Sequence, residues 1–147
     1  MTFLNNILGY RDFHKSMEID KYISSQYEHV EQDAFSNVAT LIFFKSKRQQ
    51  TWLCVSKNHL YCILDDITND NLVVRWKMDR SEIIVENNVN LKINIDPAYR
   101  ETTGLISFSE KHRNWLYSKK MFPYPNLLRE SILALIKSMM ADNEWPH

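Results

Sequence analysis

The chain has 147 residues, and its 18 Lys and Arg side chains balance 18 Asp and Glu side chains, so its formal net charge at pH 7 is zero. A dedicated nucleic-acid binder normally carries a basic excess or a basic face that neutralises phosphates, so we expect no nucleic-acid partner. The hydrophobic fraction of 44% is ordinary for a globular protein, and a chain of this length folds without a metal or disulfide staple.

The sequence lacks the motifs that mark most enzymes and cofactor sites. Its two glycines, Gly9 and Gly104, stand far apart, whereas a phosphate-binding loop needs several glycines close together. No nucleophile motif such as G-x-S-x-G accompanies its five histidines. We therefore expect a non-enzymatic protein with no catalytic residue, no cofactor and no metal. Without a secretory leader or a membrane-spanning apolar run, a cytoplasmic location is the expectation.

The first part of the chain, residues 1–37, has helical and polar character. Apolar side chains there recur at spacings of four, four and three residues, which places them on one face of a helix. These side chains are Ile19, Ile23, Tyr27 and Val30. The spacing predicts a helix over residues 18–31, and the apolar start of the chain predicts a short helical turn over residues 3–8.

From residue 38 the pattern changes to the β-branched and aromatic runs that are typical of strands. Apolar and polar side chains alternate most strictly between Val89 and Ile95. A tight hairpin is predicted at residues 57–59, where Asn58 can adopt a positive φ, and the last loop between strands is predicted at residues 110–113. The predicted strands are residues 38–45, 51–56, 60–64, 72–78, 83–85, 89–95, 105–109 and 114–118.

The last predicted element is an amphipathic helix over residues 126–141 with Asn126 as its N-cap. Its apolar stripe consists of Leu128, Ile132, Leu135, Ile136 and Met139. Antiparallel strands followed by one helix predict an α+β fold, in which the helix caps a bent antiparallel sheet or a partly open barrel. We expect one folding unit with an N-terminal helical extension over residues 1–37 and a sheet-and-helix domain over residues 38–147.

Three stretches resemble the pleckstrin-homology-like (PH-like) superfold, in particular its GRAM and bacterial variants. They are TWLCVSKNHLYCILDD, VVRWKMDRSEIIV and the closing helix NLLRESILALIKSMM. The resemblance covers residues 38–141. It implies a PH-like barrel of usually seven strands that binds phosphoinositides, peptides or other proteins and is not an enzyme. Fold alone does not choose among these ligands.

A basic rim is the first candidate site. The resemblance implies that two basic loops share the open rim of the barrel and hold phosphate by charge-assisted hydrogen bonds. The candidate ligand-binding residues are Lys45, Lys47, Arg48, Lys111 and Arg113. An acidic loop at residues 65–71 shares this rim, and its Asx side chains are typical of a turn, not of a calcium site. The alternative is a set of solvated turns, because short charge runs usually lie on the surface.

An aromatic stretch before the closing helix is the second candidate site. Aromatic side chains dominate the binding energy of protein interfaces, and the candidate docking residues are Trp115, Tyr117, Phe122 and Tyr124. The alternative is that these rings pack under the closing helix, since large aromatics are usually buried.

The two cysteines, Cys54 and Cys62, are expected on facing strands as small core residues. Together with His59 they match no standard spacing of zinc ligands. A disulfide between the two strands is conceivable from their spacing, but it is unusual in the cytosol.

We therefore expect a binding or adaptor module whose partner is another protein, reached through an exposed strand edge or through the aromatic stretch. One alternative is peripheral binding of anionic lipid or another phosphorylated ligand through the basic rim. Another is a small-molecule-binding α+β domain with an apolar pocket. An unpaired strand edge would also allow a homodimer.

Overall fold

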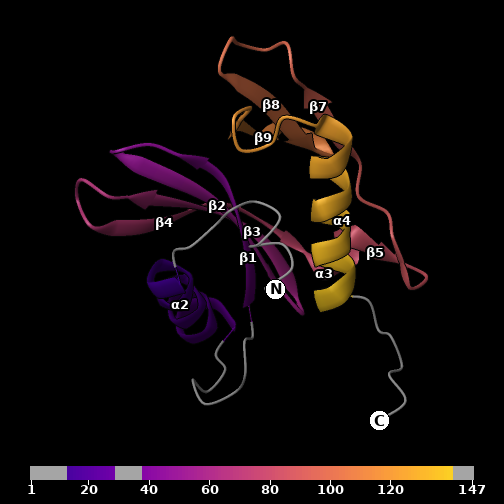
Figure 1. The fold of residues 1–147 in the computed structure, drawn as a ribbon. Coiled ribbons are helices and arrows are strands. Elements are labelled where there is room, and N and C mark those ends of the chain that lie inside the picture. Colours follow the sequence, from indigo (N-terminus) through magenta and orange to yellow (C-terminus); the bar gives the residue numbers. More distant parts are fainter. Residues whose placement is uncertain (1–12, 29–37, 141–147) are drawn as a thin grey trace.

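The computed structural model describes residues 13–28 and 38–140 (Figure 1). In this part the chain is a mixed α+β structure of antiparallel sheets, and a helix follows the last strand. None of the sheets that the described residues form closes into a barrel. The predicted α+β class and the predicted C-terminal helix are confirmed. The predicted turn at residues 3–8 and the predicted helix position Val30 lie outside the described residues.

The first described element is a helix, α2 (Phe13–Ile23), which continues as a short π-helix, η1 (Ser24–Glu28). The helix begins earlier than the predicted boundary at residue 18. Ile19 and Ile23 are fully buried, and Tyr27 packs against the same apolar cluster. The spacing of four residues in the sequence therefore identified the buried face of this segment correctly.

A four-stranded antiparallel sheet follows, in which consecutive strands are neighbours. The strands are β1 (Val38–Lys45), β2 (Gln49–Ser56), β3 (His59–Asp66) and β4 (Asn71–Asp79). All four were predicted, with ends that differ by at most two residues. Two strands contain a bulge, β1 at Phe43 and β4 at Arg75.

The turn between β2 and β3 differs in detail from the prediction. Asn58 does not adopt a positive φ. Instead, the hydroxyl of Ser56 accepts the backbone N–H of Asn58 at 3.2 Å and that of His59 at 2.9 Å. The serine side chain supplies the acceptor that closes this turn, so the backbone needs no left-handed residue.

The predicted strand at residues 89–95 is divided between two sheets. After α3 the chain forms a small hairpin of β5 and β6, and then a three-stranded sheet in the order β7, β8, β9. The bounds are α3 (Arg80–Ile83), β5 (Ile84–Val85), β6 (Asn88–Val89), β7 (Ile93–Asp96), β8 (Thr103–Phe108) and β9 (Glu110–Ser118). Asn90 donates its N–H to the carbonyl of Ile83 at 2.7 Å, which continues the β5–β6 pairing by one residue, and the chain pairs with β8 only from Ile93.

The predicted loop at residues 110–113 is wrong, because these residues belong to β9. The connection between β8 and β9 is Ser109 alone, which has a φ of 59°. Its N–H donates to the carbonyl of Lys92 at 2.9 Å, which holds the connection against the preceding segment. A charged strand end was mistaken for a polar loop.

The closing helix is α4 (Pro125–Met140). Asn126 is not its N-cap, because the helix already begins at Pro125, and Leu128 donates its N–H to the carbonyl of Tyr124 at 3.1 Å. Proline suits the first helical position, where a backbone N–H would have no helical partner. Four residues of the predicted stripe are fully buried, namely Leu128, Ile132, Leu135 and Ile136, whereas Met139 is only partly buried.

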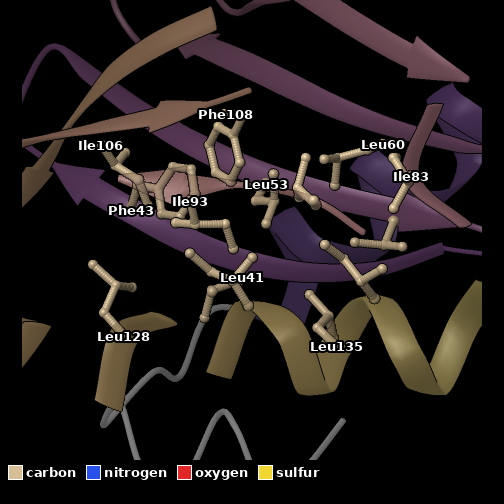
Figure 2. Close-up of a cluster of buried hydrophobic side chains, with 14 of the residues drawn as sticks. Leu41, Phe43, Leu53, Leu60, Ile83, Ile93, Ile106, Phe108, Leu128 and Leu135 are labelled. Carbon is tan, nitrogen blue, oxygen red and sulfur yellow. The ribbon is translucent and has the colours of Figure 1, made fainter. Parts of the chain in front are cut away.

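The main core lies between the two larger sheets and α4 (Figure 2). Leu41 and Leu53 face it from the four-stranded sheet, and Leu135 faces it from α4. Phe43, the bulge residue of β1, stacks on Phe108 of β8 with ring centroids 6.1 Å apart, which joins the two sheets. Each fully buried side chain of this size stabilises the fold by roughly 1.5–3 kcal/mol.

A second core lies on the other face of the four-stranded sheet, under α2 and η1. The segment runs along this face, since Lys15 lies 3.6 Å from Asp65 and Glu28 lies 2.6 Å from His59. The two contacts are six residues apart on β3 and thirteen residues apart on the helical segment. Both separations correspond to about 20 Å, so the helical segment and the strand beneath it have the same length between these contacts. Ile19 and Ile23 lie between these two ends and pack on Trp52, Cys54, Tyr61 and Ile63.

The packing of Tyr117 depends on the absence of a side chain at Gly104. The two residues face each other in the pairing of β8 with β9, and a Cβ atom at Gly104 would overlap the Tyr117 ring. Gly104→Ala should therefore lower the free energy of unfolding by about 1–3 kcal/mol, the usual cost of overpacking a core. Urea denaturation measures this change.

A double-mutant cycle is the control for this overlap. In a Tyr117→Leu background the ring is gone, so adding Gly104→Ala should cost much less than it does in the wild type. An equal cost in both backgrounds would show that Gly104 is needed for another reason.

Candidate functional site

The basic turn between β1 and β2 lies at one end of the four-stranded sheet. Lys45, Lys47 and Arg48 are exposed there. The acidic turn at residues 65–71 is its direct neighbour, because Ile67 donates its N–H to the carbonyl of Arg48 at 3.0 Å. The negative charge of the acidic turn weakens the attraction of the basic turn for a phosphate group.

Arg113 is on β9 of the three-stranded sheet and lies near the opposite end of the four-stranded sheet, beside Glu82. Its Nη1 is 3.4 Å from Oε1 of Glu82, whose other oxygen accepts the backbone N–H of Asp79. Asp79 pairs with His59 at one end of β3, whereas the basic turn is level with Asp65, six residues further along. Six residues of strand separate the two positions by about 20 Å. Arg113 therefore does not share an end of the sheet with the basic turn.

The candidate basic residues consequently do not form one patch among the described side chains. Arg113 is paired with a carboxylate, and the side chain of Lys111 lies outside the part of the chain that the structure describes. Three exposed cations remain beside an acidic turn. This arrangement is typical of solvated turns and gives little support to a phosphate site.

The aromatic stretch before α4 divides into buried and exposed rings. Tyr117 and Phe122 are buried in the main core, with ring centroids 6.4 Å apart. Trp115 is partly buried, and the guanidinium carbon of Arg75 lies 5.3 Å from its ring centroid. Tyr124, in contrast, is 68% exposed. Of the four candidate docking residues, Tyr124 presents most of its side chain to solvent.

Tyr124 stands at the edge of an apolar groove at the start of α4. The groove has a volume of about 130 Å³. Leu127 also lines it and is 42% exposed, while Ser131 adds a hydroxyl and is itself buried. The lining consists of Met121, Phe122, Pro123, Tyr124, Leu127, Leu128 and Ser131. The groove therefore offers an apolar site, and Tyr124 and Leu127 are the large exposed hydrophobic side chains in its lining.

Leu127 was missed by the sequence reasoning. It lies about 100° around the helix axis from the buried Leu128, away from the stripe that packs on the sheets. A leucine off the buried stripe of an amphipathic helix was the available signal. Leu127 could be recognised as a site residue only from the groove beside it, and that groove exists only in the folded chain.

A second groove lies between the β5–β6 hairpin and α4. Its volume is about 320 Å³, and half of its lining residues are polar. The lining consists of Asn87, Asn88, Val89, Leu133, Ala134 and Lys137.

A buried carboxylate anchors the N-terminal helical segment to the four-stranded sheet. The side chain of Glu28 is only 3% exposed, and its Oε2 lies 2.6 Å from Nδ1 of His59. The same oxygen accepts the hydroxyl of Tyr61, and Oε1 accepts Nδ2 of Asn58 at 3.3 Å. Nε2 of His59 lies 3.2 Å from Oδ1 of Asp79. The imidazole therefore stands between two carboxylates.

The hydrogen bonds at Glu28 favour its charged form. Burial alone raises the pKa of Glu28, but hydrogen bonds from Tyr61, His59 and Ser56 outweigh it and hold this pKa below its usual value. Burial, and then the contact with Glu28, raise the pKa of Tyr61, so the phenol stays protonated and donates. None of these residues lines either groove described above. The arrangement is that of a structural anchor.

The cysteines lie on opposite faces of the four-stranded sheet. Cys54 faces Tyr61 in the register of β2 and β3, whereas Cys62 faces Leu53, one residue along, and successive side chains of a strand alternate between faces. Both cysteines are buried and free. Cys54, Cys62 and His59 therefore do not converge on one point.

The free edges of the two larger sheets carry features that oppose strand pairing. β4 is one edge strand of the four-stranded sheet, with a bulge at Arg75 and exposed side chains at Arg75 and Lys77, whereas the other edge strand, β1, contacts β9. At the edge strand β7, Nε of Arg129 donates to the carbonyl of Ile93 at 3.3 Å. Bulges and cations protect an edge from pairing with another chain. The edge strands β4 and β7 therefore give little support to an added partner strand or a strand-edge dimer.

No protein-family model, curated protein or solved structure matches the chain. Among the described residues, no helix combines the length and the apolar character needed to cross a membrane. A functional conclusion therefore depends on the geometry of the grooves and clusters described above.

The anchor at Glu28 makes a prediction about stability and pH. Glu28→Gln should lower the free energy of unfolding near pH 7 by about 1–3 kcal/mol, because it weakens several hydrogen bonds to a buried group. The folded-state pKa of Glu28 is lowered, so its contribution is present above the unfolded value of 4.5 and is lost as the pH falls through the folded value. The variant should thus lose less stability than the wild type on acidification, as measured by urea denaturation across the pH range.

Glu18→Gln is the matched control, since Glu18 lies on the same helical segment with a side chain that is 59% exposed. Its pairing with Lys15 is a surface interaction, so the change should stay within about 0.5 kcal/mol. Equal losses in the two variants would contradict the anchoring role of Glu28.

Proposed function

We propose that the chain is a non-catalytic protein-binding module, and that the groove at the start of α4 holds a short apolar segment of a partner protein. The observation that carries the proposal is the pair of large exposed hydrophobic side chains, Tyr124 and Leu127, in the lining of one apolar groove. Removing apolar surface from water is favourable by roughly 25 cal/mol per Å², before the entropic cost of association is subtracted. Aromatic anchors around a well-packed pocket are the usual hot spots of protein interfaces.

The size of the grooves favours a protein segment over a small molecule. Small-molecule sites have volumes of roughly 300–1,000 Å³ and a mostly apolar lining. The groove beside Tyr124, at about 130 Å³, suits a single anchoring side chain. The second groove, at about 320 Å³, reaches the lower end of that range, but three of its six lining residues are polar.

The PH-like assignment with a partly open barrel belongs to the same proposal. Its support is the order of elements, in which four strands of one sheet and three of another precede a single closing helix. An adaptor role is what that resemblance implies, and a cytoplasmic location is part of the same proposal. Binding of anionic lipid has less support, because Arg113 pairs with Glu82 and the remaining basic turn adjoins an acidic one.

A phage-displayed library of random peptides tests the docking site. Selection on the wild type should enrich peptides with a shared aromatic or aliphatic anchor. Their affinity should fall about tenfold or more in Tyr124→Ala, since truncation of a hot-spot side chain costs about 2 kcal/mol or more. Fluorescence polarisation of the selected peptides measures the affinity. Because Tyr124 is largely exposed, its substitution should leave the fold intact.

Tyr99→Ala is the matched control, because Tyr99 is also exposed, at 43%, and lies in the loop between β7 and β8. Selected peptides should bind this variant as they bind the wild type. Failure to enrich any peptide, or equal losses in the two variants, would count against the groove as a docking site. Light scattering that shows a dimer lost in Tyr124→Ala would instead make a second copy of the chain the occupant.

A further inference from the structure

We infer that the N-terminal helical segment, α2 with η1, detaches transiently from the four-stranded sheet while the main core stays folded, and that Glu28 limits how often it detaches. The inference is independent of the proposed docking function. It depends on how differently the two layers, α4 on one face of the sheet and the N-terminal helical segment on the other, are attached to the strands between them.

The two layers cover opposite faces of the same strands. Leu53 belongs to the main core and Cys54 to the second core, because successive side chains of β2 alternate between faces. Figure 1 shows α2 and α4 apart from each other, with strands of the four-stranded sheet between them. Among the described side chains of the two clusters, only Met121 packs against both. Loss of the contacts of one layer therefore leaves most contacts of the other layer in place.

The N-terminal helical segment has few buried side chains. Between Lys15 and Glu28, these are Ile19, Ile23 and Ser24, whereas α4 buries six side chains. The segment consists of the 11 residues of α2 and the 5 residues of η1. Isolated helices of about 12–15 residues are marginal in water, so its helical state depends on contact with the sheet. Elements with few buried apolar contacts are the ones that open locally.

Polar contacts hold the segment at its two ends. At the first end, Nζ of Lys15 lies 3.6 Å from Oδ2 of Asp65, and the lysine is partly exposed. At the other end, Glu28 contacts His59 and accepts the hydroxyl of Tyr61, and its side chain is only 3% exposed. Detachment breaks these buried contacts of Glu28, so they add directly to its free-energy cost.

The two cysteines report separately on the two layers. Cys54 lies in the second core under α2, whereas Cys62 faces Leu53 on the side of the main core. Burial, and then electrostatic repulsion from Cys62 and Asp20, raise the pKa of Cys54 well above its ordinary value, and burial also raises the pKa of Cys62. Asp20 belongs to α2, which places that helix beside the Cys54 thiol. Because the thiolate is the reactive form, each thiol reacts only after the layer over it opens.

Thiol labelling of the wild type tests the inference. The protein is treated with a thiol reagent at urea concentrations below its unfolding transition, and peptide mass spectrometry measures the rate at each cysteine. Each rate is divided by the rate of the same cysteine in the unfolded chain. Where the rates are proportional to reagent concentration, they report the populations of the open states. Cys54 should react at least about tenfold faster than Cys62, and its rate should depend less on urea, because detachment exposes less surface than unfolding.

Three substitutions identify the layer that opens. Ile136→Val removes a buried group of α4 from the main core, so it should speed the labelling of Cys62 about threefold to tenfold and leave the Cys54 rate unchanged. Glu28→Gln should speed the labelling of both cysteines about fivefold or more, because its contacts are lost in the detached and the unfolded state alike. Glu18→Gln, the exposed control on the same segment, should change neither rate.

Equal labelling rates at the two cysteines, both raised by Ile136→Val, would show that the two layers open as one unit and would overturn the inference. Faster labelling of Cys62 than of Cys54 would overturn it too, since the main core would then open first. A Cys54 rate that does not change in Glu28→Gln would overturn the role of Glu28.

Discussion

The rest of the structure depends on one constraint, which is that β2 must be covered on both faces. Seven of its eight residues are buried. Leu53 and Val55 belong to the main core under α4, whereas Trp52 and Cys54 belong to the second core under α2 and η1. A single sheet with apolar side chains on both faces needs a layer on each side. The closing helix supplies one layer, and the N-terminal segment, anchored by Glu28, supplies the other.

The candidate site results from the way in which α4 covers one face of β2. The helix turns its apolar stripe toward the sheets, and Leu127 in its first turn lies off that stripe. Tyr117 and Phe122 are used to fill the core beneath, so Tyr124 is the aromatic side chain left exposed. Packing thus divides one aromatic stretch into a buried half that holds the fold and an exposed end that is available to a partner.

Local patterns in the sequence predicted most elements but not how they pair. Runs of β-branched and aromatic residues gave the positions of the first four strands, and the spacing of Ile19 and Ile23 gave the buried face of α2, because both patterns are local. The alternation from Val89 to Ile95 could not reveal that its ends join different sheets, since ladder partners are distant in the sequence. Arg113 was misplaced for the same reason, because strand register separates it from the basic turn by about 20 Å. Leu127 became visible as a site residue only once the groove was formed.

The most direct test of the docking site is an amide chemical-shift map of the isotope-labelled protein titrated with a peptide selected on the wild type. We expect the shifts that change on binding to cluster at residues 120–131, with little change at the basic turn or along α2. Changes centred on residues 45–48, or on the face of the sheet under α2, would contradict the claim that the groove at the start of α4 is the binding site.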